Sequence, residues 1–226
     1  MTQVGLVLPA AGCGSRFGTD TPKQLLALGD RPVLIHALQA FNGLVDAAVI
    51  AVSADIAQQV TAAVEKWPCQ FSIRIVPGGA TRQASVAAGL AALPPEIDTV
   101  LVHDAARPLV PQSVIANCLA AIATTGAAVV CQACTSTVKR GVDNLVSETV
   151  PREDLWLAQT PQGFRRDWGS AAFARAAEEA WVVTDDASIL EHAGHPVAIV
   201  PGDACNLKIT TPDDMAVAQA LLKARR

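Results

Sequence analysis

Short apolar runs alternate with helical patterns along most of this 226-residue chain. The runs that predict strands cover Val4–Leu8, Ala47–Val52, Phe71–Val76, Thr99–His103, Ala127–Cys131 and Val197–Val200. Helical patterns lie between them, near Val33–Asn42, Ile56–Trp67, Arg82–Leu93 and Pro111–Thr124, and a last one covers Pro212–Lys223. This alternation is typical of a mostly parallel sheet with helices on both faces. We therefore predict an α/β fold in a single domain over 1–226, with ligands bound beyond the carboxyl ends of the strands.

A glycine-rich stretch, PAAGCGSRFGTDTPKQ, covers Pro9–Gln24 directly after the first apolar run. Glycines such as Gly12 and Gly14 let backbone N–H groups approach an anion closely, because no Cβ is in the way. Arg16 and Lys23 supply the positive charge that a polyphosphate needs. The spacing matches neither a dinucleotide fingerprint nor a Walker A loop. The stretch therefore predicts a nucleotide-binding loop of another type, with a solvated surface turn as the alternative.

A carboxylate and further cations follow other predicted strands. Asp104 comes directly after the run Thr99–His103, so we expect it at the same sheet edge as the first loop. Magnesium is usually held by one or two carboxylates together with substrate phosphates. Asp104 is therefore the candidate Mg²⁺ ligand, unless it only pairs with Arg107 or caps a turn. Lys208 lies in a mostly apolar context and should have an anionic partner, because burying an unpaired charge is costly.

Three other segments carry weaker signals. Gly79 and Ser85 flank the start of a helical pattern, where they can hold a base or ribose or simply end a strand. Thr184 precedes two aspartates whose position is explained equally well by a helix cap. The polar, alternating segment Thr135–Thr149 predicts a β-hairpin with Gly141 and Asp143-Asn144 at its centre. An isolated hairpin is marginal in water, so we expect it to pack against a second subunit.

Composition narrows the function classes. The net charge is −4 and no basic patch occurs, so we expect no nucleic-acid partner. No apolar run approaches the ~20 residues that span a bilayer, so we expect no membrane association. The six cysteines are scattered, as in a protein of the reducing cytoplasm, and Cys131-x-x-Cys134 lacks the second pair of a zinc site. With cations and a polyphosphate loop but no Ser-His-Asp arrangement, the pattern favours phosphoryl or nucleotidyl transfer.

The motifs PAAGCGSR, PKQ, HDAARP, QTPQ, TDDA and NLKIT, in this order, resemble those of the 2-C-methyl-D-erythritol 4-phosphate cytidylyltransferase family. The resemblance runs from Val4 to about Ala220. It implies a Rossmann-like nucleotidyltransferase fold and a homodimer joined by a protruding β-arm at about 135–152. It also implies a Mg²⁺-dependent reaction in isoprenoid precursor synthesis. In that reaction CTP and 2-C-methyl-D-erythritol 4-phosphate give 4-diphosphocytidyl-2-C-methyl-D-erythritol and pyrophosphate.

The resemblance also implies roles for individual residues. Those that would hold the CTP phosphates and the transition state are Arg16, Lys23 and Lys208. Those that would form the rest of the CTP site are Ala10, Ala11, Gly12, Gly14, Gly79 and Ser85. Those that would bind the acceptor are Thr137, Arg152, Thr184, Asp104 and Arg107, with Asp104 also the metal ligand and with Thr137 and Arg152 coming from the neighbouring subunit. Ser136 and Ala84 stand where the family often has aspartate.

Three rival functions fit parts of the pattern. A cytidylyltransferase for another polyol phosphate, such as ribitol 5-phosphate, would share the CTP site and differ around the arm, where Ser136 lies. A catalytically silent nucleotide-binding subunit is disfavoured, because a mere binder needs no cation at the α-phosphate. An NAD(P) oxidoreductase is disfavoured by the broken fingerprint and by the lack of a suitably placed acidic residue after the second strand.

Overall fold

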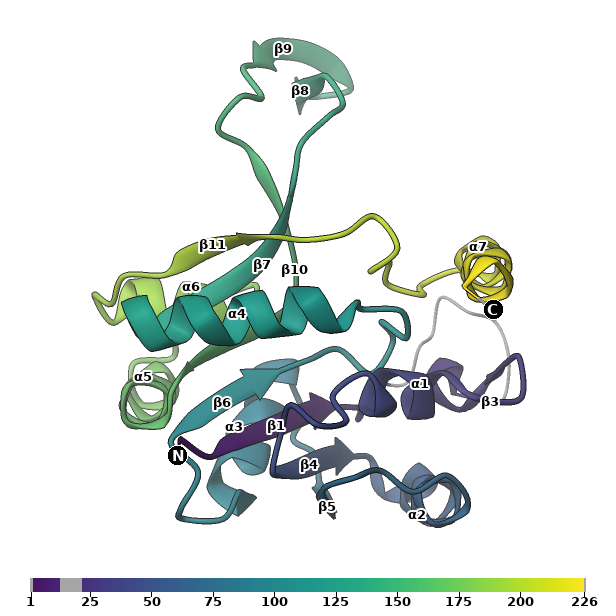
Figure 1. Ribbon diagram of the computed structural model, residues 1–226. Coiled ribbons are helices and arrows are strands. Elements are labelled where there is room, and N and C mark those ends of the chain that lie inside the picture. The colour runs from purple at the N-terminus through teal and green to yellow at the C-terminus, as the bar shows by residue number, and fades with distance from the viewer. Residues whose placement is uncertain (1, 13–21, 226) are drawn as a thin grey trace.

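A seven-stranded sheet forms the centre of the computed structural model, which describes residues 2–12 and 22–225 (Figure 1). The strand order is β11-β7-β10-β6-β1-β4-β5. The strands are β1 (Val4–Pro9), β4 (Ala47–Val52), β5 (Ser72–Pro77), β6 (Thr99–Val102), β7 (Ala127–Ala133), β10 (Trp156–Arg165) and β11 (Ala198–Pro201). Neighbouring strands are parallel except where β10 pairs with β6 and β7. The prediction of a mostly parallel α/β sheet is confirmed.

The strand of the central sheet that the sequence did not reveal is β10, whose composition is mixed. Its burial is nearly complete from Gln159 to Phe164, yet Gln159, Thr160 and Gln162 are polar. These side chains stay buried because each one hydrogen-bonds to neighbouring segments. A buried strand with that many polar residues does not show the apolar run by which the other strands were found.

Helices cover both faces of the sheet (Figure 1). One face carries α1 (Val33–Gln39), α2 (Ala57–Lys66) and α4 (Gln112–Thr125), and the other carries α3 (Arg82–Ala92), α5 (Arg166–Glu178) and α6 (Asp186–His192). The side chains alternate between the faces along each strand. Ile50 therefore packs with Leu38 and Ile115 in one core, and Val49 packs with Phe164 in the other. Each fully buried side chain of this size contributes about 1.5–3 kcal/mol.

Short elements and the last helix complete one side of the domain. They are the 3₁₀ helices η2 (Lys23–Leu25) and η3 (Ala54–Ile56), the small ladder of β2 (Ala27–Leu28) with β3 (Arg31–Pro32), and α7 (Pro212–Ala224). Helix α7 starts with the expected proline and is capped by the Thr211 hydroxyl. It packs on Leu28, Val33 and Ile209 in a third apolar cluster, which joins the C-terminal helix to the segment after Lys23.

The order of the strands places a ligand crevice next to β1. The chain runs from β1 to β4 and β5 on one side and then returns to form β6 on the other side of β1. Open α/β sheets bind ligands at this kind of switch point, beyond the carboxyl ends of the strands. Ala10 and Asp104, which follow β1 and β6 closely, therefore lie at the edge where the sequence predicted the site.

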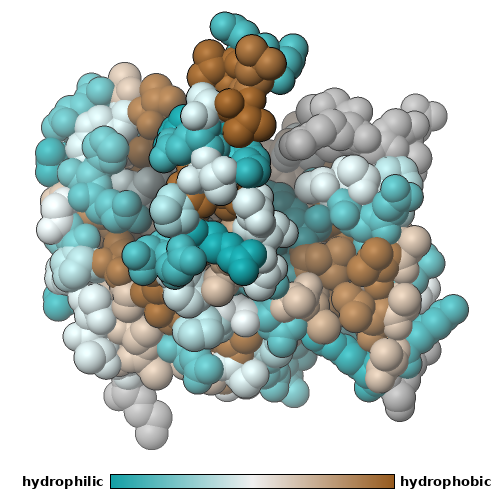
Figure 2. Space-filling model, turned by 90° about the horizontal axis from the view of Figure 1, so that it is seen from above, coloured by the Kyte–Doolittle hydropathy of each residue, from teal (hydrophilic) through white to brown (hydrophobic). Residues whose placement is uncertain are grey.

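The predicted hairpin is confirmed and stands away from the main body (Figure 1). It consists of β8 (Val138–Val142) and β9 (Leu145–Val150), with Asp143 and Asn144 at positive φ of 50° and 63° in the turn. Left-handed residues at both central positions match the right-handed twist of a two-residue hairpin turn. Its apolar side chains are exposed, with Leu145 at 74% and Val146 at 66%. Figure 2 views the molecule from the side on which the hairpin projects and shows patches of hydrophobic surface in brown.

The described cysteines form no disulfides, and the described helices are too short or too polar to cross a membrane. In the described part of the chain the thiols, Cys131 and Cys134 among them, are free. None of the helices in residues 2–12 and 22–225 combines the length and the apolar character that crossing a bilayer requires.

Candidate active site

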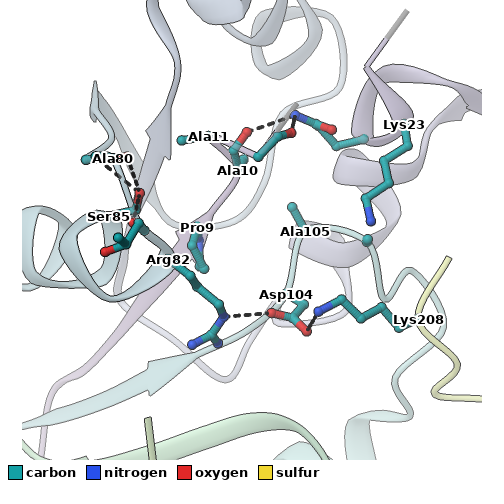
Figure 3. Close-up of a pocket in the computed structure, with 15 residues that line it drawn as sticks. Pro9, Ala10, Ala11, Lys23, Ala80, Arg82, Ser85, Asp104, Ala105 and Lys208 are labelled. Carbon is teal, nitrogen blue, oxygen red and sulfur yellow. Dashed lines mark hydrogen bonds and ion pairs between the residues drawn. The ribbon is translucent and has the colours of Figure 1, made fainter. Parts of the chain in front are cut away.

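A cavity opens at the switch point, and several separate segments contribute to its wall (Figure 3). Predicted site residues that line it are Ala10, Ala11, Gly12, Lys23, Gly79, Ser85, Asp104 and Lys208. The side chains of Lys23 and Lys208 point into it from one side and that of Arg82 from the other. Arg16 and Gly14, which we also predicted for this site, lie outside the described residues. The fold thus gathers residues from distant parts of the sequence into one place.

Asp104 is surrounded by cations. Its Oδ2 lies 2.9 Å from Lys208 Nζ and 3.5 Å from Arg107 Nε, and its Oδ1 lies 3.3 Å from Arg82 Nε. Burial by itself would raise the pKa of Asp104, but Arg82, Lys208 and Arg107 outweigh it and hold that pKa far below its usual range. The carboxylate is therefore charged at neutral pH. Arg82 also pairs with Asp186, so Arg82, Arg107 and Lys208 face two carboxylates, and Lys23 adds a further cation to the cavity wall. The site is therefore net positive, which suits a polyphosphate.

A buried histidine supports the turn that carries Asp104. His103 is fully buried, and its burial lowers its pKa to about 4, so the ring is neutral at pH 7. Its Nε2 lies 3.0 Å from the Arg107 carbonyl, which only accepts, so the ring proton is on Nε2. The Thr160 hydroxyl then donates to His103 Nδ1 at 2.9 Å and accepts from the Asp104 N–H at 3.1 Å. This chain of hydrogen bonds fixes the backbone of Asp104.

Buried amides connect the remaining motifs beneath the cavity. Asn206 Nδ2 donates to the Thr160 carbonyl at 2.7 Å, and Arg107 Nη1 donates to the Asn206 carbonyl at 2.7 Å. Gln162 Nε2 donates to Asp185 Oδ2 at 3.0 Å. Hydrogen bonds thus join the motifs HDAARP, QTPQ and NLKIT, and QTPQ to TDDA.

Lys208 is held beside Asp104 by its own neighbours. The N–H of Ile209 donates to the Ala106 carbonyl at 2.8 Å, and the Ile209 side chain is fully buried. The lysine side chain remains 40% exposed at the cavity. Its backbone is therefore fixed while its ammonium group keeps access to a ligand.

The glycine pair before α3 is packed too tightly for side chains. A Cβ on Gly78 would lie 2.5 Å from Ala11 Cβ, and one on Gly79 would lie 2.4 Å from Ala84 Cβ. The Gly79 N–H donates to Ser85 Oγ at 3.1 Å, and Ser85 is buried. The backbone at Gly79 therefore forms part of the cavity wall itself.

Two residues of the site were missed from the sequence. Gln24 is buried and donates from Nε2 to the Ala10 carbonyl at 2.8 Å, which attaches η2 to the end of β1. Arg82, the first residue of α3, contacts Asp104 and also binds Asp186. The signal for Gln24 was its place in the PKQ motif, whereas Arg82 looked like an ordinary residue at the start of a helix.

The other predicted site residues lie elsewhere. Thr137 and Arg152 are exposed near the base of the hairpin, where Arg152 donates to the Thr135 carbonyl. Thr184 lines a smaller cavity next to the first, and Arg82 lines both cavities. Arg107 is largely buried behind Asp104, and its side chain is not part of the cavity wall.

The residues of the cavity fit a magnesium ion that takes one ligand from the protein and most of the others from a bound nucleotide and water. Within residues 2–12 and 22–225, no cluster of three or more histidine, cysteine, aspartate or glutamate side chains could hold a metal. Asp104 is the carboxylate in the cavity wall, and its charge is already balanced by cations. Magnesium is commonly held by one or two carboxylates plus substrate phosphates. The site therefore suits a metal that binds together with a nucleotide.

The family model for 2-C-methyl-D-erythritol 4-phosphate cytidylyltransferase matches residues 4–224. The chain belongs to this family. A 2-C-methyl-D-erythritol 4-phosphate cytidylyltransferase from Salinibacter ruber is 43% identical over 220 residues, which cover 96% of this chain and 92% of that one. The family resemblance that the sequence motifs indicated is confirmed, and the predicted transfer from CTP to 2-C-methyl-D-erythritol 4-phosphate is the activity of this family.

Solved structures of the family share the fold. The 2-C-methyl-D-erythritol 4-phosphate cytidylyltransferase of Thermus thermophilus superposes with a TM-score of 0.82 at 35% identity, covering 98% of this chain and 100% of that one. The 4-diphosphocytidyl-2C-methyl-D-erythritol synthase of Anaerococcus prevotii gives a TM-score of 0.86 at 27% identity, covering 98% and 96%. The predicted Rossmann-like nucleotidyltransferase fold is confirmed.

Proposed function

We propose that this cytidylyltransferase uses the cavity at the switch point to transfer CMP from CTP to 2-C-methyl-D-erythritol 4-phosphate, in a Mg²⁺-dependent reaction. One observation carries the assignment to this cavity. Lys23 and Lys208 point into one cavity across from the closely packed backbone at Gly79, and Lys208 and Arg82 contact the buried Asp104 in its wall. Such a wall suits a base, and such a concentration of positive charge suits a triphosphate.

The reaction needs no general base, because the acceptor's phosphate is already an anion. An oxygen of that phosphate forms a bond to the α-phosphorus of CTP. The bond from this phosphorus to the bridging oxygen breaks, and its electron pair leaves with pyrophosphate. Positioning and charge neutralisation then account for catalysis. Arg16, Lys23 and Lys208 would face the charge that develops on the phosphates.

Asp104 would hold Mg²⁺ in the presence of the nucleotide. When bound, the metal would neutralise phosphate charge and orient the triphosphate. The low pKa of Asp104 supports this role, since a ligand carboxylate must be ionised. Lys208 contacts the same carboxylate at 2.9 Å, so it is placed to exchange this partner for a phosphate oxygen when the nucleotide arrives.

The acceptor would bind beside the nucleotide and across a subunit boundary. Thr184 lies in the adjoining smaller cavity, on the same chain as the CTP site. Thr137 and Arg152 are exposed by the hairpin and would reach the acceptor of a second subunit in a homodimer. Exposed Leu145 and Val146 on the hairpin support such packing, because an apolar strand pair is marginal when left in water.

Pyrophosphate release, measured with Mg²⁺ and CTP and with one acceptor at a time, tests the proposal. We expect release with 2-C-methyl-D-erythritol 4-phosphate and none with ribitol 5-phosphate. Pyrophosphate release with ribitol 5-phosphate alone would support the assignment of the CTP site and refute the assignment of the acceptor. If neither acceptor gives release while CTP still binds, the protein is a nucleotide-binding subunit and the proposal is wrong.

A further inference from the structure

Arg82 is held between two carboxylates that belong to different elements. Its Nη1 and Nη2 donate to Asp186 Oδ1 and Oδ2 at 2.9 and 2.7 Å, and its Nε lies 3.3 Å from Asp104 Oδ1. The Asp186 side chain is only 1% exposed, whereas that of Arg82 is 32% exposed. Both oxygens of the buried Asp186 carboxylate therefore accept hydrogen bonds from the Arg82 guanidinium group.

The bidentate pair determines where Arg82 can point. Two parallel hydrogen bonds fix the plane of a guanidinium group, which a lysine cannot reproduce. Asp186 is itself fixed, because Asp185 caps α6 and Gln162 binds both Asp185 and the N–H of Ala187. The Nε–H, which the two bonds to Asp186 leave free, donates to Asp104 Oδ1, as Figure 3 shows.

Cations contact both oxygens of Asp104. Arg82 contacts Oδ1, while Lys208 and, at a longer distance, Arg107 contact Oδ2. The contacts of Arg82 and Lys208 come from opposite sides of the cavity, so together they set the rotation of the carboxylate about its χ2 angle. Without Arg82, only the contacts at Oδ2 would restrict the χ2 angle of Asp104.

We propose that Asp186 and Arg82 form a positioning pair that orients Asp104 toward the metal-bound triphosphate. Asp186 touches neither the main cavity wall nor Asp104 directly, and acts through Arg82. This inference rests on the proposed function, in which Asp104 meets Mg²⁺ and CTP. Residues that orient a metal ligand typically change metal affinity by about 10–100-fold when they are removed.

The test compares Arg82→Lys and Asp186→Asn with the wild-type protein and with Asp167→Asn. The control removes another bidentate pair, that of Arg165 with Asp167, whose nitrogen–oxygen distances are 3.1 and 2.6 Å. That pair is exposed, and neither residue lines the main cavity. Thermal melting of each variant identifies any that does not fold, and Arg82→Lys carries the test if Asp186→Asn does not.

Calorimetric binding of CTP is measured once with Mg²⁺ and once with EDTA. We expect Arg82→Lys and Asp186→Asn to weaken binding about tenfold or more with Mg²⁺ and less than about twofold with EDTA. Asp167→Asn should match the wild type in both conditions. Equal weakening with and without Mg²⁺ would make Arg82 a direct phosphate contact or a structural residue, and would overturn the proposal. Unchanged binding in both conditions would overturn it too.

A double-mutant cycle with Asp104→Asn shows whether Arg82 and Asp186 act through Asp104 or independently of it. If Asp186 works through Asp104, then Asp186→Asn lowers kcat/KM in the wild-type background and has little further effect in Asp104→Asn. Additive losses would contradict this route. A wild-type protein without turnover would refute the proposed function, while the calorimetric comparison would still decide the role of the pair.

Discussion

The Gly79→Ala substitution should damage the CTP site in a way that can be calculated from the structure. The new Cβ would lie 2.4 Å from Ala84 Cβ and 3.0 Å from the Ala84 carbonyl carbon. The first distance is about 1 Å shorter than the closest ordinary contact of 3.4 Å. Ala84 has no flexible side chain that can swing aside, so the loop backbone has to move.

The size of the effect follows from that displacement. Forcing an extra carbon into a packed region costs about 1–3 kcal/mol. A loss of about 2 kcal/mol lowers the melting temperature of a chain of this length by roughly 4–8 °C. Movement of the loop also breaks the 3.1 Å hydrogen bond from Gly79 to Ser85. If one hydrogen bond to the nucleotide is lost, at about 1.4 kcal/mol, KM for CTP rises about tenfold.

The assay is steady-state pyrophosphate release together with thermal melting, and the double variant Gly79→Ala/Ala84→Gly is the internal control. Removing the Ala84 methyl group should restore part of the CTP affinity, but not all of it, because the Ala84 Cα would still lie 3.2 Å from the new Cβ. Normal melting and a normal KM in Gly79→Ala would refute the close packing on which this reasoning depends.

Further predictions concern charge, assembly and pH. Lys23→Ala should lower kcat about 10²–10³-fold with a modest change in KM, as for loss of one donor to developing charge; near-normal turnover would contradict its role. Leu145→Arg should shift sedimentation from dimer to monomer and reduce turnover, whereas Val217→Arg, at an exposed position on α7, should do neither. Burial lowers the pKa of His103 to about 4, whereas the ring in the unfolded chain keeps its usual pKa of about 6.5. As the pH falls below 6.5 the unfolded state therefore takes up a proton that the folded state does not, and stability declines from there toward pH 4. Denaturant titrations should therefore show roughly 2 kcal/mol less stability at pH 5 than at pH 7, and equal stability at both would contradict the buried neutral ring.

Most of the sheet could be predicted because its strands are plain apolar runs. Ala47–Val52 is buried at every position and was found with its bounds unchanged. Strand β10 was missed because Gln159, Thr160 and Gln162 are buried for their hydrogen bonds rather than for their hydrophobicity. Polar groups that are buried and satisfied leave no periodic signal in the sequence.

Some residues of the site could likewise be predicted from the sequence, and others could not. Asp104 could be found because it directly follows a buried strand, and Lys208 because it is a lone cation in an apolar context; the two contact each other at 2.9 Å. Arg82 could not be found, because its role depends on Asp186, which lies more than a hundred residues away. Its position at the start of a helix carries no information about a partner in another helix.

Product analysis of the complete reaction tests the central claim most directly. Wild-type protein, CTP, Mg²⁺ and 2-C-methyl-D-erythritol 4-phosphate would be followed by phosphorus NMR. The account predicts that 4-diphosphocytidyl-2-C-methyl-D-erythritol and pyrophosphate appear in equal amounts. Pyrophosphate with free CMP, or CTP left unchanged, would contradict transfer to the acceptor in this cavity.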